Sequence, residues 1–232
     1  MRNARDQSVN GVGQPSTMPG KLVESVNSLD PQDFFKKYLA RDTLSALTKH
    51  EKLRAVLTDA GRTIPAESKC LLEQCLWLIE STSGQDYRNS ESKWSASRKR
   101  KEMRFPDMRY VILVEDQGAG HAEPQVAGFV SFMITYEDGR EVVYCYEIHL
   151  AEPYRGKGLG KRLMRVVEEV GRKVGVEKSM LTVFRANRRA IKMYEGLGYA
   201  EDAFSPAPRQ LRNGTVKQAS YMILSKDMRT AG

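Results

Sequence analysis

The chain contains 232 residues, carries a formal net charge of +8 and has an isoelectric point near 9.4. This length is enough for one domain with a full core and a tail. Three cysteines without C-x-x-C spacing and three scattered histidines exclude a disulfide framework and a metal site of the usual ligand spacing. No stretch approaches the roughly 18 apolar residues of a membrane helix, so we expect a soluble protein. Cysteines without a disulfide framework favour the cytoplasm and nucleus, and we expect a monomer.

The charge is unevenly distributed along the chain. Residues 155–192 contain twelve Lys and Arg against three Glu, a net charge of +9. Residues 137–152 contain five acidic residues against one Arg, a net charge of −4. A basic site beside an acidic site suits an anionic cofactor and a cationic substrate. It suits a nucleic-acid groove less well, and we expect direct contact with neither nucleic acid nor a membrane.

The first third of the chain predicts a tail followed by small elements. Residues 1–28 are polar and rich in Gly, Pro, Ser and Asn, which predicts a disordered tail before a single domain over residues 29–228. Residues 33–40 predict a short helix whose aromatic side chains dock on the domain. Residues 53–58 fit a strand or a helix, and we favour a first strand.

Two helices are expected next, over residues 66–82 and 87–103. The first has a clear apolar face, while the second is highly charged. Its basic run, residues 98–101, is more often a solvated helix face than a nuclear signal or a nucleic-acid patch. Trp94 has two interpretations, a core residue or a residue that lines a pocket.

Strands are expected over residues 110–114, 126–134 and 141–150. The Asp138-Gly139 pair predicts a tight hairpin between the last two. Alternation in the third strand places Val143, Cys145, Glu147 and His149 on one face, and the intervening tyrosines on the other.

A glycine-rich basic turn, residues 155–161, follows that strand. The residues after it have an apolar stripe at helical spacing, and an apolar run at residues 180–184 completes a strand–turn–helix–strand unit. The helix N-terminus offers unpaired backbone N–H groups, so the turn is suited to a phosphate or pyrophosphate. A P-loop is excluded because the spacing is one residue short and Arg162 replaces the hydroxyl residue, and a dinucleotide fingerprint is incomplete. A basic turn without a ligand is the alternative.

The remaining chain predicts a helix from Asn187 with Gly198 as its C-cap, a loop over residues 203–214 and a last strand over residues 219–225. Asn187 has two interpretations, an ordinary N-cap and a cofactor ligand.

These motifs resemble the GNAT acetyltransferases. Arg155, Gly158 and Gly160 match the family's [QR]-x-x-G-x-[GA] pattern, and residues 181–187, 194–195 and 198–199 are similar to the second half of the domain. The string Val-Tyr-Cys-Tyr-Glu at residues 143–147 is similar to the histone N-terminal acetyltransferases within that family. The resemblance implies an α/β (α+β mixed) fold with a mostly antiparallel central sheet and a parallel βαβ cofactor unit.

The resemblance also implies the cofactor, the partners and the site. The cofactor would be acetyl-CoA, and the substrates would be the free N-terminal amines of histone H4 and histone 2A, which begin Ser-Gly-Arg-Gly; ribosome association stays open. The implied catalytic residues are Glu147 as general base, Tyr144, Tyr146 and, as general acid or core aromatic, Tyr194. The implied cofactor-binding residues are Ile148, His149, Leu150, Arg155, Gly156, Lys157, Gly158, Leu159, Gly160, Lys161 and Asn187. The implied substrate-binding residues are Tyr87, Trp94, Glu137, Asp138, Tyr144 and Tyr221, with no metal ligand.

Two departures from the family pattern bear on substrate choice. The family's acidic residue in the strand before the hairpin has no clean counterpart, since Thr135 and Tyr136 fall there, and Ser92 replaces a second tryptophan. Acetylation of lysine side chains or small amines is therefore the alternative within the family, and a nucleic-acid or chromatin-binding module is the alternative outside it. For Glu147 we expect desolvation to raise the pKa toward the range useful for a base, with a structural ion pair as the alternative.

Overall fold

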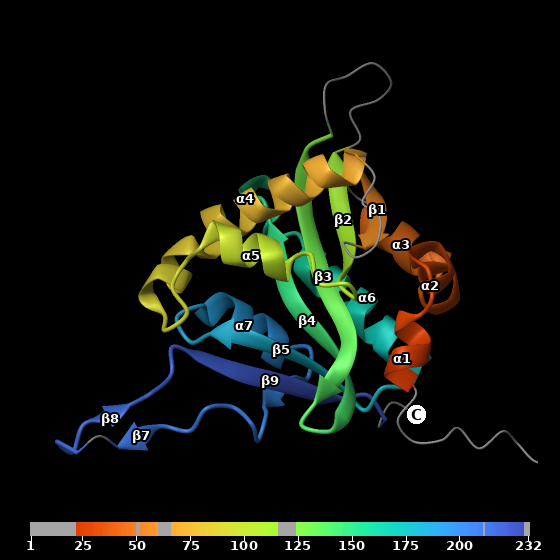
Figure 1. Ribbon diagram of the computed structural model, residues 1–232. Coiled ribbons are helices and arrows are strands. Elements are labelled where there is room, and N and C mark those ends of the chain that lie inside the picture. The colour runs from red at the N-terminus through yellow and green to blue at the C-terminus, as the bar shows by residue number, and fades with distance from the viewer. Residues whose placement is uncertain (1–21, 50–51, 60–65, 116–123, 211, 230–232) are drawn as a thin grey trace, which may run out of the picture.

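A seven-stranded mixed sheet forms the centre of the protein. The computed structural model describes residues 22–49, 52–59, 66–115, 124–210 and 212–229. The strand order is β1-β2-β3-β4-β5-β9-β6, and every neighbouring pair is antiparallel except β4 and β5, which are parallel. This is the GNAT arrangement that the resemblance implied (Figure 1).

The strands of this sheet are β1 (Leu53–Asp59), β2 (Arg109–Glu115), β3 (Val126–Glu137), β4 (Arg140–Leu150), β5 (Lys178–Phe184), β6 (Ala200–Glu201) and β9 (Tyr221–Asp227). The helices are α1 (Leu22–Asn27), α2 (Pro31–Tyr38), α3 (Arg41–Thr48), α4 (Ala66–Asn89), α5 (Ala96–Glu102), α6 (Leu159–Val174) and α7 (Arg188–Glu195), with a short 3-10 turn at Glu152–Tyr154. A separate hairpin, β7 (Arg209–Gln210) and β8 (Val216–Lys217), extends from the body (Figure 1).

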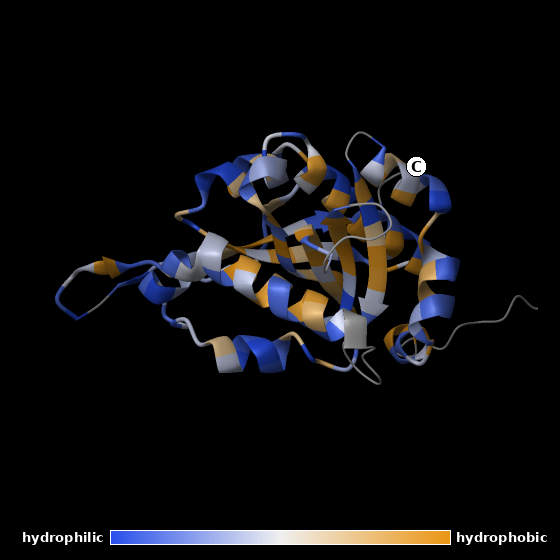
Figure 2. Cartoon of the chain, turned by 90° about the horizontal axis from the view of Figure 1, so that it is seen from above, coloured by the Kyte–Doolittle hydropathy of each residue, from blue (hydrophilic) through white to orange (hydrophobic). Residues whose placement is uncertain are grey.

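The two faces of the sheet bury two apolar cores. Helices α1, α2, α3, α6 and α7 contribute to the larger core, whereas α4 and α5 close the smaller one on the opposite face. Apolar strand residues lie between these helix layers (Figure 2). The apolar stripe of α6 is fully buried, which confirms the predicted βαβ unit, because residues at that spacing share one face of a helix.

The β3–β4 hairpin turns at Asp138 and Gly139, which both have positive φ angles, 49° and 75°. A two-residue turn with this geometry matches the twist of the flanking strands, so the predicted hairpin is confirmed. Within the hairpin the register shifts, since Ser131 pairs with Glu147 but Phe132 pairs with Cys145. Tyr146 is thus the extra residue of a β-bulge, which changes the face of every side chain after it.

Several expected boundaries were wrong. The predicted tail ended too late, because Val23 and Val26 are buried in α1; residues 1–21 lie outside the described residues. The second predicted helix began too early, because α4 continues to Asn89 and a break precedes α5. At this break Lys93 has a φ of 53°, which a helix interior excludes. Helix α7 ends at Glu195, and its C-cap is Gly196 rather than Gly198.

Other expectations for the same segments are confirmed. Residues 53–58 form a strand, and Phe34, Phe35 and Tyr38 of α2 are buried, as predicted. The structure also contains α3, which was not predicted, and a β7–β8 hairpin whose first strand lies inside the expected loop and whose second strand follows it. None of the helices in the described segments combines the length and the apolarity needed to span a bilayer.

Candidate active site

A cavity of about 1060 Å³ opens where β4 and β5 separate. The two strands pair from Val142↔Lys178 to Cys145↔Leu181, and beyond this point β5 pairs only with β9. The C-terminal half of β4 therefore turns one backbone edge toward the cavity instead of toward a neighbouring strand. Helix α4, the α4–α5 connection and the glycine-rich turn complete the walls.

Most of the predicted site residues line this one cavity. They are Tyr87, Trp94, Tyr146, Glu147, Ile148, His149, Leu150, Arg155, Gly156, Gly158, Leu159, Gly160, Lys161, Asn187, Tyr194 and Tyr221. Four do not line it. Tyr144 lies beside it, where its hydroxyl contacts the lining residue Thr182 at 2.6 Å, and Lys157 stacks over the ring of Tyr154. Glu137 and Asp138 lie at the hairpin end of β3.

The glycine-rich turn gives the cavity a cationic end. Gly156 and Gly158 have φ angles of 79° and 80°, a backbone conformation that L side chains rarely adopt. Gly158 caps α6 without a side chain, so the first N–H groups of that helix stay open at the positive end of its dipole. Arg155, Lys161 and Arg189 add positive charge around them.

This turn fits the pyrophosphate of coenzyme A in chemistry and in space. A Cβ placed on Gly158 would meet nothing nearer than an Arg162 nitrogen at 4.0 Å, so the backbone there is open to a ligand, whereas a Cβ on Gly160 would lie 3.1 Å from the sulfur of Met193, where α6 packs closely on α7. The Arg155 side chain is held in place because its Nε donates to the carbonyl of Leu150 at 2.9 Å. Asn187 is the N-cap of α7, where its side chain accepts from the N–H of Ala190 at 3.1 Å. Asn187 also lines the cavity, and its role as a cofactor ligand stays a prediction.

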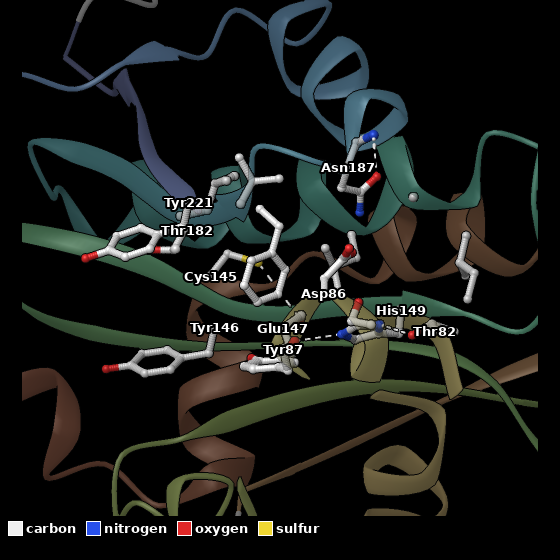
Figure 3. A pocket seen from close by; sticks show the side chains of 18 of the residues that line it. Thr82, Asp86, Tyr87, Cys145, Tyr146, Glu147, His149, Thr182, Asn187 and Tyr221 are labelled. Carbon is white, nitrogen blue, oxygen red and sulfur yellow. Dashed lines mark hydrogen bonds and ion pairs between the residues drawn. The ribbon is translucent and has the colours of Figure 1, made fainter. Parts of the chain in front are cut away.

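Glu147 is the centre of a buried polar network (Figure 3). Its Oε1 accepts from Lys99 Nζ at 2.7 Å and from the Tyr87 hydroxyl at 2.8 Å. Its Oε2 lies 2.6 Å from His149 Nε2. Lys99 also donates to Glu102 at 2.6 Å, so one buried ammonium bridges two carboxylates.

This network contradicts the expected pKa of Glu147. Burial by itself raises the pKa of this carboxyl, but the charge of Lys99 and the bond from His149 outweigh burial and lower the pKa to about 2. The pKa of Lys99 is raised despite its burial, chiefly by Glu147. Both directions agree that the two groups are ionised. The expectation was wrong because Lys99 comes from α5, 48 residues away, and counters the desolvation.

His149 links α4 to the Glu147 carboxylate. Its Nδ1 lies 2.6 Å from the Thr82 hydroxyl, which donates to the carbonyl of Leu78 at 2.7 Å, and its Nε2 lies 2.6 Å from Glu147 Oε2. Val143 and Cys145 belong to the larger core, whereas Glu147 and His149 face α4 on the other side of the sheet. The prediction that these four side chains share one face was therefore wrong, because the bulge at Tyr146 reverses the alternation after it.

An aromatic wall borders the other end of the cavity. Tyr87 packs against Trp94 at 5.4 Å and against Phe184 at 4.9 Å between ring centroids. Tyr144 and Tyr146 pack against each other with ring centroids 5.3 Å apart and ring planes tilted by 56°. Burial is the largest cause of the raised pKa values of these three tyrosines, about 12 for Tyr144. Trp94 thus lines the pocket and also packs against the smaller core, so both of its interpretations hold.

The acidic residues of the β3–β4 hairpin, Glu137 and Asp138, lie outside the cavity, but the charge of Glu137 affects two tyrosines at its edge. Glu137 is half-buried, and its pKa is raised by burial and by the charge of Asp138. Its own charge helps to raise the pKa of Tyr144 and Tyr146, which places it near the phenols. Whether this hairpin binds substrate stays a prediction.

Lys99 and Asp86 are among the site residues that the sequence did not reveal. The basic run around Lys99 predicts a solvated helix face, but the Lys99 side chain is buried, and in the described structure only Arg100 of the remaining run forms an ion pair, with Glu73. No sequence motif points to Asp86, although it lies next to Tyr87 in the helix and lines the cavity. Its position one turn after Thr82 on α4 was the available signal, because residues four apart share a helix face.

Comparison with known proteins agrees with this fold. The chain is 32% identical over 166 residues to N-alpha-acetyltransferase 40 of Saccharomyces cerevisiae, covering 60% of this chain and 54% of that protein. It is 32% identical over 133 residues to mycothiol acetyltransferase of Corynebacterium aurimucosum, covering 55% of this chain and 38% of that protein. The chain therefore spans about half, or less, of the length of these relatives.

A solved structure, smu.2055 of Streptococcus mutans, has a TM-score of 0.51 at 17% identity and covers 75% of this chain and 99% of that chain, a likeness of fold alone. The model of the family described as "Acetyltransferase (GNAT) family" matches residues 74–199. These residues include the cavity walls from α4 to α7 and make up more than half of the sequence. The chain belongs to the acetyltransferase (GNAT) family.

Proposed function

We propose that this protein transfers acetyl from acetyl-CoA to the free α-amino group of proteins that begin Ser-Gly-Arg-Gly, as histone H4 and histone 2A do. One observation carries the proposal. A single cavity joins a pyrophosphate-type turn at Gly158 and Gly160 to an aromatic acceptor wall at Tyr87, Trp94 and Tyr221. The similarity to N-alpha-acetyltransferase 40 supports the choice of an N-terminal amine.

Acetyl-CoA would supply an activated acetyl group as a thioester. The backbone N–H groups at the start of α6, together with Arg155 and Lys161, would hold its phosphates. The free edge of β4 at Ile148–Leu150 would hold the chain that leads to the thioester. Tyr194 faces this cavity, and burial raises its pKa well above the ordinary value. Its phenol therefore keeps its proton at neutral pH and is suited to donating it to a leaving thiolate.

Glu147 receives a different role from the one expected. An α-ammonium has a pKa of about 7.7–8.0, and the pKa of the Glu147 carboxyl is lowered below its ordinary value by Lys99 and His149 despite burial, so this carboxylate is a poor acceptor for the ammonium proton. We assign Glu147 the task of fixing Tyr87, Lys99 and His149 at the floor of the cavity. The acceptor wall is then held by a network whose members all have partners, which makes it rigid.

Substrate choice would depend on the surface between the tyrosines and the hairpin. Glu137 and Asp138 offer carboxylates near Tyr144 and Tyr146, and the third residue of a Ser-Gly-Arg-Gly sequence offers a guanidinium. Charge-assisted hydrogen bonds between such groups are among the stronger ones in proteins. This pairing would distinguish an arginine at position three from other residues.

Acetylation of a small amine or a lysine side chain is the second candidate. The similarity to mycothiol acetyltransferase favours it, since that protein's name specifies a small-molecule substrate. A nucleic-acid module is disfavoured, because Lys99 of the basic run is buried in the Glu147 network and Arg100 is paired with Glu73.

The decisive experiment incubates the protein with acetyl-CoA and either intact histones or peptides, and maps the products by mass spectrometry. We expect acetyl on the α-amine of Ser-Gly-Arg-Gly and none on a peptide whose N-terminus is blocked. Acetyl found only on lysine side chains, or only on small amines such as spermidine, would replace the proposed substrate by the second candidate.

A further inference from the structure

Three carboxylates line the cavity among the described residues: Asp86, Glu102 and Glu147. Two of them share one cation, since Lys99 donates to Glu102 at 2.6 Å and to Glu147 at 2.7 Å. Asp86 differs from both. Within the described part of the chain it has neither an ion pair nor a hydrogen bond, so its charge is uncompensated by any direct contact.

The fold aims Asp86 at the middle of the cavity. It lies on α4 one turn after Thr82, which contacts His149, and directly before Tyr87, which donates to Glu147. Figure 3 shows its side chain pointing from α4 into the cavity. The Asp86 side chain is half-buried, so its carboxylate is only partly hydrated.

The other charges of the cavity are unsuited to receive a cation. Lys161 and Arg189 make the end at the glycine-rich turn positive, and Lys99 neutralises the Glu147 floor. An incoming ammonium therefore meets one carboxylate that is free to pair with it. Such a pair forms without breaking an existing bond of the protein, whereas pairing with Glu147 would compete with Lys99.

We propose that Asp86 is the carboxylate that binds the ammonium of the substrate and accepts its proton. The ammonium transfers one proton from nitrogen to an Asp86 oxygen, which leaves a neutral amine with a lone pair and a neutral carboxyl. The carboxyl then releases this proton to solvent through the cavity mouth, so no further reactant is needed. The inference rests on amine acetylation, and only its choice of first probe rests on the proposed N-terminal substrate.

Four full-length variants test the proposal. Asp86→Asn removes the charge and the basicity, and Asp86→Glu keeps both. Glu80→Gln is the matched control, since Glu80 is an exposed carboxylate on the same helix that lies outside the cavity lining. Glu147→Gln tests the competing acceptor. Melting temperature and acetyl-CoA affinity of each variant establish that it is folded and loaded.

The first readout is kcat/KM with the Ser-Gly-Arg-Gly peptide. We expect Asp86→Asn to lower it about 100–1000-fold, Asp86→Glu to stay within about tenfold of the wild type, and Glu80→Gln to stay within about twofold. The second readout needs no turnover. Calorimetry should show that the free-amine peptide binds Asp86→Asn about 10–100-fold more weakly than the wild type, whereas an N-acetylated peptide binds both proteins equally.

A folded Asp86→Asn variant that matches Glu80→Gln in both readouts overturns the proposal, and selective loss in Glu147→Gln would assign the proton to Glu147. If the wild type prefers Nα-acetyl-lysine amide or spermidine over the peptide, the proposed N-terminal substrate fails. The same comparison, with the preferred amine as the probe, then still tests Asp86. Transfer to none of the three amines overturns both proposals.

Discussion

Replacing Lys99 by methionine should destabilise the protein by about 3–5 kcal/mol, because it leaves the Glu147 carboxylate buried without its cation. Both side chains are about 8% exposed, and their charged atoms are 2.7 Å apart. The pKa of Glu147 gives a second route to the magnitude. Its fall from an ordinary 4.5 to about 2 corresponds to about 3 kcal/mol at 1.36 kcal/mol per pH unit, which is what remains of the stabilisation by Lys99 and His149 after the opposing effect of burial.

A double-mutant cycle in denaturant isolates this pair. We would measure the free energy of unfolding of the wild type, Lys99→Met, Glu147→Gln and the double variant, with Lys101→Met as the control. Lys101 lies on the same helix but is exposed, so its replacement should change stability by less than about 0.5 kcal/mol. The double variant should lose about 2–3 kcal/mol less than the sum of the single losses, since it removes both charges together.

The pH dependence of the same stability difference has a definite sign. A carboxyl whose pKa is lowered on folding stabilises the native state above its unfolded pKa, near 4.5 here, and this contribution disappears as the pH falls toward 2. Because the unfolded states of the two proteins carry the same Glu147 carboxyl, the advantage of the wild type over Lys99→Met should shrink on acidification and be lost as the pH falls toward 2. Additive losses in the cycle, or an advantage that grows on acidification, would refute the pairing.

Three further predictions concern the cofactor turn, the core and the hairpin. Gly160→Asp should abolish acetyl-CoA binding in calorimetry, because it places a side chain and a negative charge at the start of α6; unchanged affinity in a folded variant would remove the cofactor assignment. Gly171→Ala should destabilise the protein by about 1–3 kcal/mol in thermal or urea unfolding, although alanine favours helices, because its Cβ would lie 2.7 Å from a methyl of Val143; a stabilised variant would contradict this packing. Glu137→Gln with Asp138→Asn should lower kcat/KM for a Ser-Gly-Arg-Gly peptide about 10–100-fold and hardly affect a peptide with alanine at position three; equal losses for both peptides would exclude arginine recognition.

The sequence was sufficient for the parts of the site that are local in the chain. The turn from Arg155 to Lys161, the helix after it and the hairpin at Asp138 and Gly139 depend on residue order over a few positions. Glycine spacing and apolar periodicity record such order directly. The placement of Tyr87, Trp94 and Tyr221 at the same cavity came instead from the family resemblance, because nothing in their spacing relates α4 to β9.

The state of Glu147 was beyond a local interpretation. Its pKa depends on a lysine 48 residues earlier and on a histidine two residues later. In regular alternation Glu147 and His149 share a face with Cys145, and only the bulge at Tyr146 turns them toward α4. The burial of Glu147 agrees with the prediction. Whether its pKa rises or falls, however, is decided by Lys99 and His149, which the fold places beside it.

The positions of Lys99 and of the hairpin carboxylates explain why the basic run (residues 98–101) and the acidic segment (residues 137–152) do not each form one half of the site. Lys99 leaves the basic run to neutralise Glu147, and Glu137 and Asp138 remain outside the cavity on the hairpin. The cavity is thus positively charged at the glycine-rich turn, whereas at its floor the charge of Lys99 offsets that of Glu147. Its free negative charge comes from Asp86, a residue in neither segment. A cationic substrate and an anionic cofactor can then be held in one cavity without either one displacing an internal ion pair of the protein.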